Sequence, residues 1–206
     1  MNKLFLILVL IGIVIVVTSF SLFATPSETH TPLYVPGFTF YDVEKIQSEL
    51  SLQNISLSAP TAITDHTVKQ YCTYFGNNEL KTVEYCTTSV ILDSDGRSIG
   101  NVNMGGTTDG PIMALAILDT DDLFSENYVD IVFQIMIQTL VCDCWNDQKP
   151  GNFESVAAWI DAAKSKFIES PQSTLTSKIN GLGGMNLVLE ITAKDDSYLW
   201  TLIILK

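Results

Sequence analysis

A long apolar segment opens the chain. Residues 4–24 contain three hydroxyl side chains and no charged residue. About 20 consecutive apolar residues are enough to cross a bilayer as an α-helix. Lys3 precedes the segment, and the next basic residue is Lys45. The positive-inside rule therefore predicts a cytoplasmic N-terminus and an exported remainder.

A cleavable signal peptide is the alternative interpretation of this segment. Signal peptides have a shorter apolar region, about 7–15 residues, that ends at a small-x-small site. The apolar segment here is longer, and its candidate sites at residues 17–19 and 19–21 fit that pattern poorly. We therefore expect a transmembrane signal anchor over residues 1–24, which contacts the lipid bilayer through residues 4–24. Cleavage near residues 20–25 would instead give a secreted protein.

The segment after the anchor changes character twice. Residues 25–40 contain three prolines, which are incompatible with a helix and predict a semi-extended spacer. Residues 40–50 then repeat apolar side chains at helical spacing, with acidic residues in the first turn. This pattern predicts a short amphipathic helix at the start of one exported domain, residues 41–206.

Stretches rich in β-branched and aromatic residues predict a sheet. The expected strands are residues 67–75, 80–92, 97–104, 112–119, 185–193 and 198–206. Turn-forming sequences separate them, including the dipeptide Asp95-Gly96, which is typical of a primed β-turn. The apolar run Ile203–Leu205 predicts a last strand that is covered on both faces and lies inside the sheet.

Two helices are expected between these strand groups. Residues 125–145 are apolar except for one narrow stripe, which indicates a helix buried on most sides. The stripe consists of Asn127, Asp130, Gln134 and Gln138. Residues 153–169 form an ordinary amphipathic pattern that ends before Pro171. The predicted fold class is α+β: a mainly antiparallel sheet of about six strands, with these two helices packed on one face.

Charge restricts the choice of partner. The chain of 206 residues has a net charge of −12, and 47% of its residues are hydrophobic. Lys3 is the only charged residue before residue 25, so the rest carries 10 basic and 23 acidic side chains. Such a surface repels phosphate, so we expect no nucleic-acid partner. Solubility of an exported domain accounts for the acidity.

The four cysteines predict disulfides, because an even number of thiols outside the membrane is normally oxidised. They are Cys72, Cys86, Cys142 and Cys144. We favour two crosslinks from the helix at 125–145 to the strands, since Cys142 and Cys144 would point about 200° apart on a continuing helix. The alternative is a pair across the hairpin, Cys72–Cys86, together with a very tight Cys142–Cys144 ring.

Other roles for these cysteines fit the sequence less well. A structural zinc site usually contains Cys-x(2–4)-Cys knuckles, and the chain has Cys-x13-Cys and Cys-x-Cys instead. A redox pair is commonly Cys-x-x-Cys, and that motif is absent from the sequence. Structural crosslinking is therefore the expected role.

Candidate chemistry elsewhere is sparse. The only histidines are His30 and His66, and no nucleophile, phosphate-loop or zinc-protease motif occurs in the sequence. The acidic positions are weak calcium candidates, because their spacing breaks the EF-hand pattern and fits a solvated helix entrance better. These positions are Asp119, Asp121, Asp122 and Glu126. Asn54 begins a glycosylation sequon, Asn-Ile-Ser.

The sequence thus favours a single-pass membrane protein whose exported domain is a non-catalytic binding or envelope-associated module stabilised by disulfides. No catalytic residue, cofactor or resident metal is assigned. A domain that binds a metal or a small molecule is the first alternative. An enzyme whose site is assembled only in three dimensions is the second.

Overall fold

The computed structural model describes residues 37–63, 67–76, 79–107, 109–123, 127–169 and 173–206, with residues 69–70 and 74–82 described by their backbone alone. The predicted anchor at residues 1–24 and most of the spacer lie outside these ranges. Within them, no helix has the length and apolar character needed to cross a membrane. Residues 36–206 cluster into one unit.

This unit is an α+β domain, which confirms the predicted class. Its helices are α2 (Asp42–Ser51), α3 (Val68–Tyr71), α4 (Tyr128–Leu140), α5 (Trp145–Gln148) and α6 (Val156–Glu169), with a 3-10 turn at Pro150–Asn152. Its strands are β1 (Ser56–Leu57), β2 (Thr61–Ile63), β3 (Thr73–Gly76), β4 (Glu79–Thr82), β5 (Tyr85–Leu92), β6 (Ser98–Thr107), β7 (Gly110–Thr120), β8 (Thr174–Leu182), β9 (Met185–Ala193) and β10 (Tyr198–Leu205).

The main sheet is antiparallel and open, and it has eight strands instead of the predicted six. Its order is β1-β5-β6-β7-β10-β9-β8, and β2 also pairs with β5. The last strand lies inside the sheet as predicted, because Leu202 pairs with Ala116 of β7 on one side and with Leu189 of β9 on the other. Strands β3 and β4 form a separate two-stranded ladder.

Strand β8 is the main element that the sequence pattern did not predict. Within Thr174–Leu182 only Leu175, Ile179 and Leu182 are buried. The strand pairs only with β9 and forms the edge of the sheet. An edge strand needs few apolar side chains, so its alternation is too weak to recognise in the sequence.

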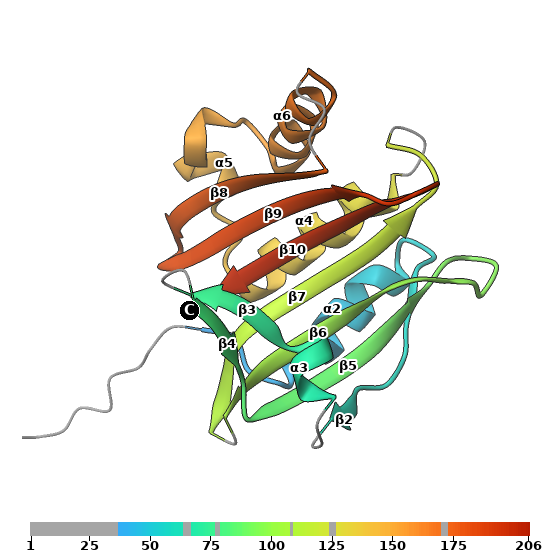
Figure 1. Cartoon of the computed structure of the whole chain (residues 1–206). Coiled ribbons are helices and arrows are strands. Elements are labelled where there is room, and N and C mark those ends of the chain that lie inside the picture. The colour runs from blue at the N-terminus through green and yellow to red at the C-terminus, as the bar shows by residue number, and fades with distance from the viewer. Residues whose placement is uncertain (1–36, 64–66, 77–78, 108, 124–126, 170–172) are drawn as a thin grey trace, which may run out of the picture. The chain divides into compact units, whose positions relative to one another are not determined.

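Helices α2, α4 and α6 cover one face of the sheet. Figure 1 shows α2 and α4 behind the strands. The alternation of side chains along a strand directs every second residue of β7, β9 and β10 towards these helices. The largest fully buried side chains between these helices and the sheet include Phe133 of α4, Trp159 of α6 and Trp200 of β10. The predicted packing of both later helices on one face is confirmed.

A smaller core lies on the opposite face, under α3 and the β3–β4 hairpin, which are in front of the sheet in Figure 1. It contains Ile63, Val68, Cys72, Val83, Cys86, Met113 and Leu115. The hairpin segment sits directly on β6: a Cβ atom added to Gly105 would lie 3.1 Å from Cys72 Sγ. Glycine at position 105 therefore makes room for the sulfur.

The structure corrects two predicted strands. The expected strand at 67–75 begins instead with α3, and the expected strand at 80–92 is divided into β4 and β5. The chain leaves the β3–β4 ladder after Thr82 and joins the main sheet, where the Glu84 amide donates to the Gly106 carbonyl at 3.1 Å. One continuous β-rich sequence therefore belongs to two sheets.

The turn at residues 93–97 is present, but its type differs from the prediction. Gly96 has φ +78°, whereas Asp95 is not among the residues with positive φ. A primed turn centred on Asp95-Gly96 would need positive φ at both positions. The Asp93 carboxylate instead closes the turn by accepting hydrogen bonds from the Asp95 and Arg97 amides, each at 2.9 Å.

Candidate functional site

All four cysteines are in disulfides, and no described cysteine is free. Cys72 is bonded to Cys86, with their Cα atoms 6.1 Å apart. Both side chains are fully buried in the smaller core. The bond ties the β3–β4 segment to strand β5 and so holds the second layer on the sheet.

The other disulfide joins Cys142 and Cys144, with their Cα atoms 5.1 Å apart. It lies where α4 has ended, because the predicted helix at 125–145 stops at Leu140 and the chain turns before α5. Both cysteines are only half-buried. Nε2 of Gln148 lies 3.1 Å from Cys144 Sγ and donates a hydrogen bond to it.

The favoured helix-to-sheet connectivity is wrong, and the alternative pairing is observed. The sheet separates the two pairs, because Cys86 points into the smaller core while Cys142 and Cys144 pack against the core on the helical face. Side chains on opposite faces of a sheet cannot meet through it. Since all four sulfurs are oxidised, they do not form the tetrathiolate zinc site considered as an alternative.

The two disulfides differ in what they can contribute to stability. In the chain-entropy model a crosslink stabilises by restricting the unfolded chain, more so for longer loops. The sequence separation is 14 for Cys72–Cys86 and 2 for Cys142–Cys144. The corresponding estimates are about 3 kcal/mol and about 1.5 kcal/mol. The second bond therefore contributes much less to holding the fold.

The predicted acidic positions are not gathered into one site. Asp119 pairs with Lys194 at 3.1 Å, and its backbone carbonyl accepts a hydrogen bond from the Tyr128 hydroxyl. Asp121 and Asp122 are exposed, and Glu126 lies outside the described residues. The part of the chain that the structure describes contains no group of three or more His, Cys, Asp and Glu side chains able to hold a metal ion. His30 and His66 are outside it.

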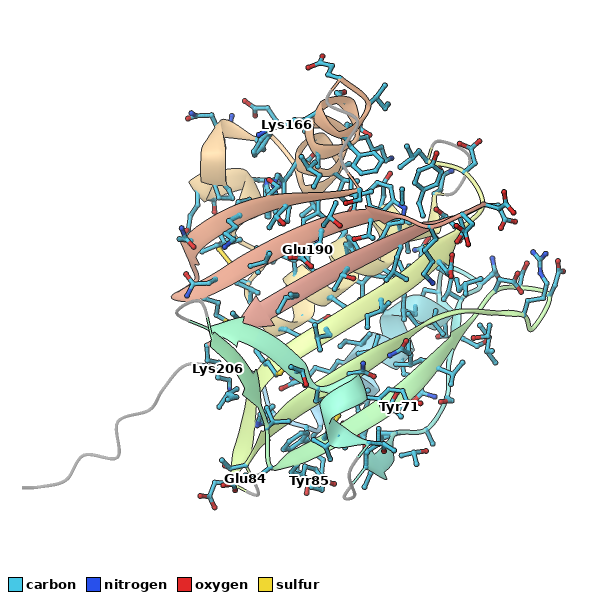
Figure 2. All side chains as sticks on the ribbon, viewed as in Figure 1. Tyr71, Glu84, Tyr85, Lys166, Glu190 and Lys206 are labelled. Carbon is cyan, nitrogen blue, oxygen red and sulfur yellow. A yellow bond between two sulfur atoms is a disulfide. The ribbon has the colours of Figure 1, made fainter. Side chains whose placement is uncertain are left out.

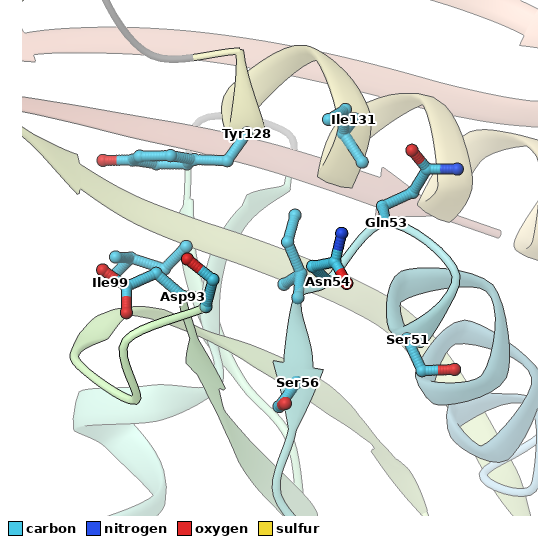
Figure 3. A pocket seen from close by; sticks show the side chains of 10 residues that line it. Ser51, Gln53, Asn54, Ser56, Asp93, Ile99, Tyr128 and Ile131 are labelled. Carbon is cyan, nitrogen blue, oxygen red and sulfur yellow. The ribbon is translucent and has the colours of Figure 1, made fainter.

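An open groove of about 670 Å³ brings distant segments of the described chain together. Figure 3 shows its three sides: the segment after α2, the β5–β6 turn, and the first turns of α4. Its lining combines amides, hydroxyls and a few apolar side chains: Ser51, Gln53, Asn54, Ile55, Ser56, Asp93, Ser94, Ile99, Tyr128 and Ile131. The groove thus offers neutral hydrogen-bonding groups around an apolar base.

The carboxylate in this groove is already engaged. The hydrogen bond from the Arg97 amide lowers the pKa of Asp93 most, and burial opposes it. Further hydrogen bonds from the Arg97 side chain and the Asp95 amide keep the pKa of Asp93 below its usual value. Nε of Arg97 also donates to Asp93 Oδ2 at 2.8 Å. Asp93 therefore shapes the β5–β6 turn and is poorly suited to act as a general acid or base.

Asn54, the glycosylation candidate, also lines the groove. Its side chain is exposed and its backbone is left-handed, with φ 59°. Asparagine tolerates this conformation better than most residues, which explains its place in the turn after α2. Modification of Asn54 stays a prediction, and a glycan there would emerge from the groove.

Asp130 of α4 lies in an unfavourable environment for a charged carboxylate. Burial raises the pKa of its carboxyl, and Asp161 raises it further, whereas Lys164 of α6 lowers it. Oδ1 of Asp130 is buried without a hydrogen-bond partner and lies 3.9 Å from Lys164 Nζ. Lys164 also lies 5.7 Å from the ring of buried Trp200. This cluster joins α4 to α6.

The sheet face opposite the helices is of mixed polarity where β8, β9 and β10 form it. Thr176, Glu190 and Thr201 pair across the three strands, and Figure 2 shows Glu190 on the side turned away from α4. Thr176 donates to Glu190 at 3.4 Å. Val188 and Ile203 form the next row and are half-buried. This face is not a continuous apolar patch.

No family model matches the chain, and neither the curated proteins nor the solved structures include one that is significantly similar to it. The structure itself defines the class: a globular α+β domain with two disulfides. Function has to be inferred from the chain's own residues.

Proposed function

We propose that this chain is a membrane-tethered, exported protein whose disulfide-bonded domain is a non-catalytic binding module. The observation that carries the proposal is the oxidation of all four cysteines in two separate pairs. Disulfides form and persist in exported proteins, whereas cytosolic reductants keep thiols reduced. The pairing therefore supports an oxidising compartment for the domain.

The tether is supported by the sequence alone. Residues 4–24 are long and apolar enough for one membrane crossing, and Lys3 lies on their N-terminal side. The domain would then face outward on a proline-containing spacer. Its acidic surface fits this place, because it would be repelled by anionic lipid headgroups and would stand away from the membrane.

The groove beside Asn54 is the proposed binding surface. Its amides and hydroxyls can pair with neutral polar groups, and Tyr128, Ile99 and Ile131 supply apolar contact area. Its one carboxylate, Asp93, is held by Arg97, which favours binding over acid–base chemistry. Small-molecule binding is the second candidate, since about 670 Å³ falls within the range of ligand pockets.

Fractionation of cells that express the full-length chain tests the tether and the compartment together. We expect the protein in the membrane fraction, with its domain digested by protease added outside the cell. Alkylation of denatured, non-reduced protein should find no free thiol. A matched variant with Ile13→Lys and Val16→Lys should lose membrane association, because each central charge costs about 2.5–3.5 kcal/mol on insertion.

Two other outcomes would decide against parts of this proposal. Full-length protein that is dissolved in the cytosol with four reactive thiols would exclude both export and disulfides. A mature N-terminus near residue 20, found by N-terminal sequencing, would replace the anchor with a cleaved secretion signal and leave the exported domain in place.

A further inference from the structure

The two disulfides differ in their exposure to an attacking thiol. Cys72 and Cys86 are fully buried. Val83 and the backbone of Gly105 lie close to the Cys72 side chain. Cys142 and Cys144 are half-buried, with exposed Asp143 between them. Exchange requires a thiolate to reach one sulfur of the bond. The second disulfide is the more exposed of the two in the folded domain and is therefore the better target.

A surface hollow lies beside the residue between the two cysteines, Asp143. It has a volume of about 480 Å³ and opens between α2 and the C-terminal half of α4. Asp143, the residue between the two cysteines, is one of its lining residues, together with Gln138 and Thr139 of α4. A peptide segment of a partner that enters this hollow would therefore arrive beside the bond.

The flanking residues hold both sulfurs in place whether or not they are bonded. Leu140, two residues before the pair, is buried in the main core, and so is Trp145, directly after it. Nε1 of Trp145 donates to the Phe153 carbonyl at 3.1 Å, and its ring contacts that of Trp159 at 5.8 Å. The helix is ended by backbone bonds from Val141 and Cys142 to Ile137. The reduced segment would thus stay folded and could close again.

The contacts of the two sulfurs are unequal. Nε2 of Gln148 donates to Cys144 Sγ at 3.1 Å, and the same amide would stabilise a thiolate at Cys144. Cys142 Sγ lies beside Gly183 in the β8–β9 turn, where a Cβ atom would come within 3.5 Å of it. Gly183, with φ +55°, brings the β8–β9 turn close to Cys142, so this sulfur has a backbone neighbour and, among the described residues, no hydrogen-bond donor comparable to Gln148. The better-stabilised sulfur is the better leaving group.

From this geometry we infer that Cys142–Cys144 is a thiol-exchange site that passes its disulfide to an accessible pair of thiols in a partner protein. It acts alongside the proposed binding role and requires only that the bond forms. The inference revises the expectation from sequence that all four cysteines are purely structural.

The exchange balances in two steps. A partner thiolate attacks Cys142 Sγ, the bond to Cys144 breaks, and Cys144 leaves as a thiolate beside Gln148. The second thiolate of the partner then attacks the partner's own sulfur in the mixed disulfide, and Cys142 leaves as a thiolate. The partner loses two electrons and gains a disulfide, while the domain becomes a dithiol. A small-molecule disulfide such as oxidised glutathione restores the bond.

Graded reduction of the full-length protein in detergent tests this inference. Aliquots are equilibrated with increasing dithiothreitol, alkylated in the folded state, and mapped by mass spectrometry. We expect Cys142 and Cys144 to be labelled while Cys72–Cys86 stays closed, with an unchanged circular dichroism spectrum. Oxidised protein should then convert a synthetic dithiol peptide to its disulfide with one-to-one stoichiometry.

Several results would overturn the inference. These are the opening of both disulfides at the same dithiothreitol concentration, unfolding on loss of Cys142–Cys144, an unoxidised dithiol peptide, or isolation of Cys142 and Cys144 as thiols from the oxidising compartment. The first three can be read from purified protein without locating it in a cell. Failure of the membrane tether would therefore be distinguished from failure of the exchange site.

Paired glutamine variants test the role given to Cys144. Gln148→Ala removes the donor to its sulfur, and we expect bond opening to slow by about tenfold, because the departing Cys144 thiolate loses its hydrogen bond. Gln134→Ala is the matched control, because Gln134 is an exposed amide of α4 that does not line the hollow. Equal opening rates in the two variants would refute the assignment.

Discussion

Single residues in this domain show how burial sets the cost of a charge. Asp42 is buried, which alone would raise its pKa, but hydrogen bonds from Lys45 and from the amide and hydroxyl of Thr39 lower the pKa overall. The Thr39 and Asp42 contacts close the turn that leads into α2. Asp130 has no such donors within hydrogen-bond distance. Burial in the fold therefore disfavours the charged form of Asp130.

The raised pKa of Asp130 predicts a stabilising substitution. The folded state holds this proton more tightly than the unfolded state, so the favourable contribution is present below the unfolded pKa of 3.8 and is lost as pH rises through the folded value. Asp130→Asn should therefore raise the melting temperature at pH 7. The gain should shrink towards pH 3, where the wild-type carboxyl is protonated. Calorimetry at both pH values measures it.

Asp161→Asn provides the control for this substitution. Asp161 also pairs with Lys164, at 3.3 Å, but its side chain is 67% exposed. We expect little change in melting temperature, because exposed pairs contribute about 0–1 kcal/mol. A lower melting temperature for Asp130→Asn at pH 7 would mean that the attraction between Asp130 and Lys164 outweighs the cost of burial.

At the scale of elements, hydrophobic periodicity and residue propensity were sufficient to predict the helices and strands that bury one well-marked apolar face. The polar stripe of α4 is real: Asn127, Gln134 and Gln138 are exposed, and Asp130 is partly so. Elements at edges and crossings were the ones missed or divided. Strand β8 has too few buried positions, and the segment after Thr82 changes sheets without a sequence break.

The Cys72–Cys86 bond belongs to this scale, because it fastens one layer to the next. Replacing both residues with alanine should lower the free energy of unfolding by about 3 kcal/mol. This is the contribution expected from the closure entropy of a loop of about 15 residues. Alanine at Cys142 and Cys144 should cost at most about 1.5 kcal/mol. Urea denaturation of the two double variants compares these values.

A larger loss in the Cys142/Cys144 variant would contradict this ranking. It would indicate that the short ring, and not the flanking core residues Leu140 and Trp145, fixes the chain after α4. Alanine is chosen because a buried serine hydroxyl at position 72 or 86 would add the cost of an unpaired polar group.

At the scale of the whole molecule, the groove is built by segments that are far apart in the chain. Gln53 follows α2, Asp93 lies in the β5–β6 turn, and Tyr128 begins α4. None of the three carries a recognisable motif. Their convergence follows from α2 and α4 packing side by side on the same sheet face.

Site-specific photo-crosslinking tests the groove as the binding surface. A photoreactive amino acid at position 53 should give partner adducts on cells that display the protein. The same group at Lys166, an exposed residue of α6 that does not line the groove, should give none. Adducts from position 166 alone would move the binding surface to α6.

The sequence by itself determined the class of the domain, the burial of α4, the interior place of the last strand and the oxidised state expected of the cysteines. These follow from local periodicity and composition, which act over a few residues. Tertiary structure alone decided the disulfide pairing, the edge strand and the groove. Each depends on which face of the sheet a distant segment covers, and side-chain alternation assigns that face only after the strands have paired.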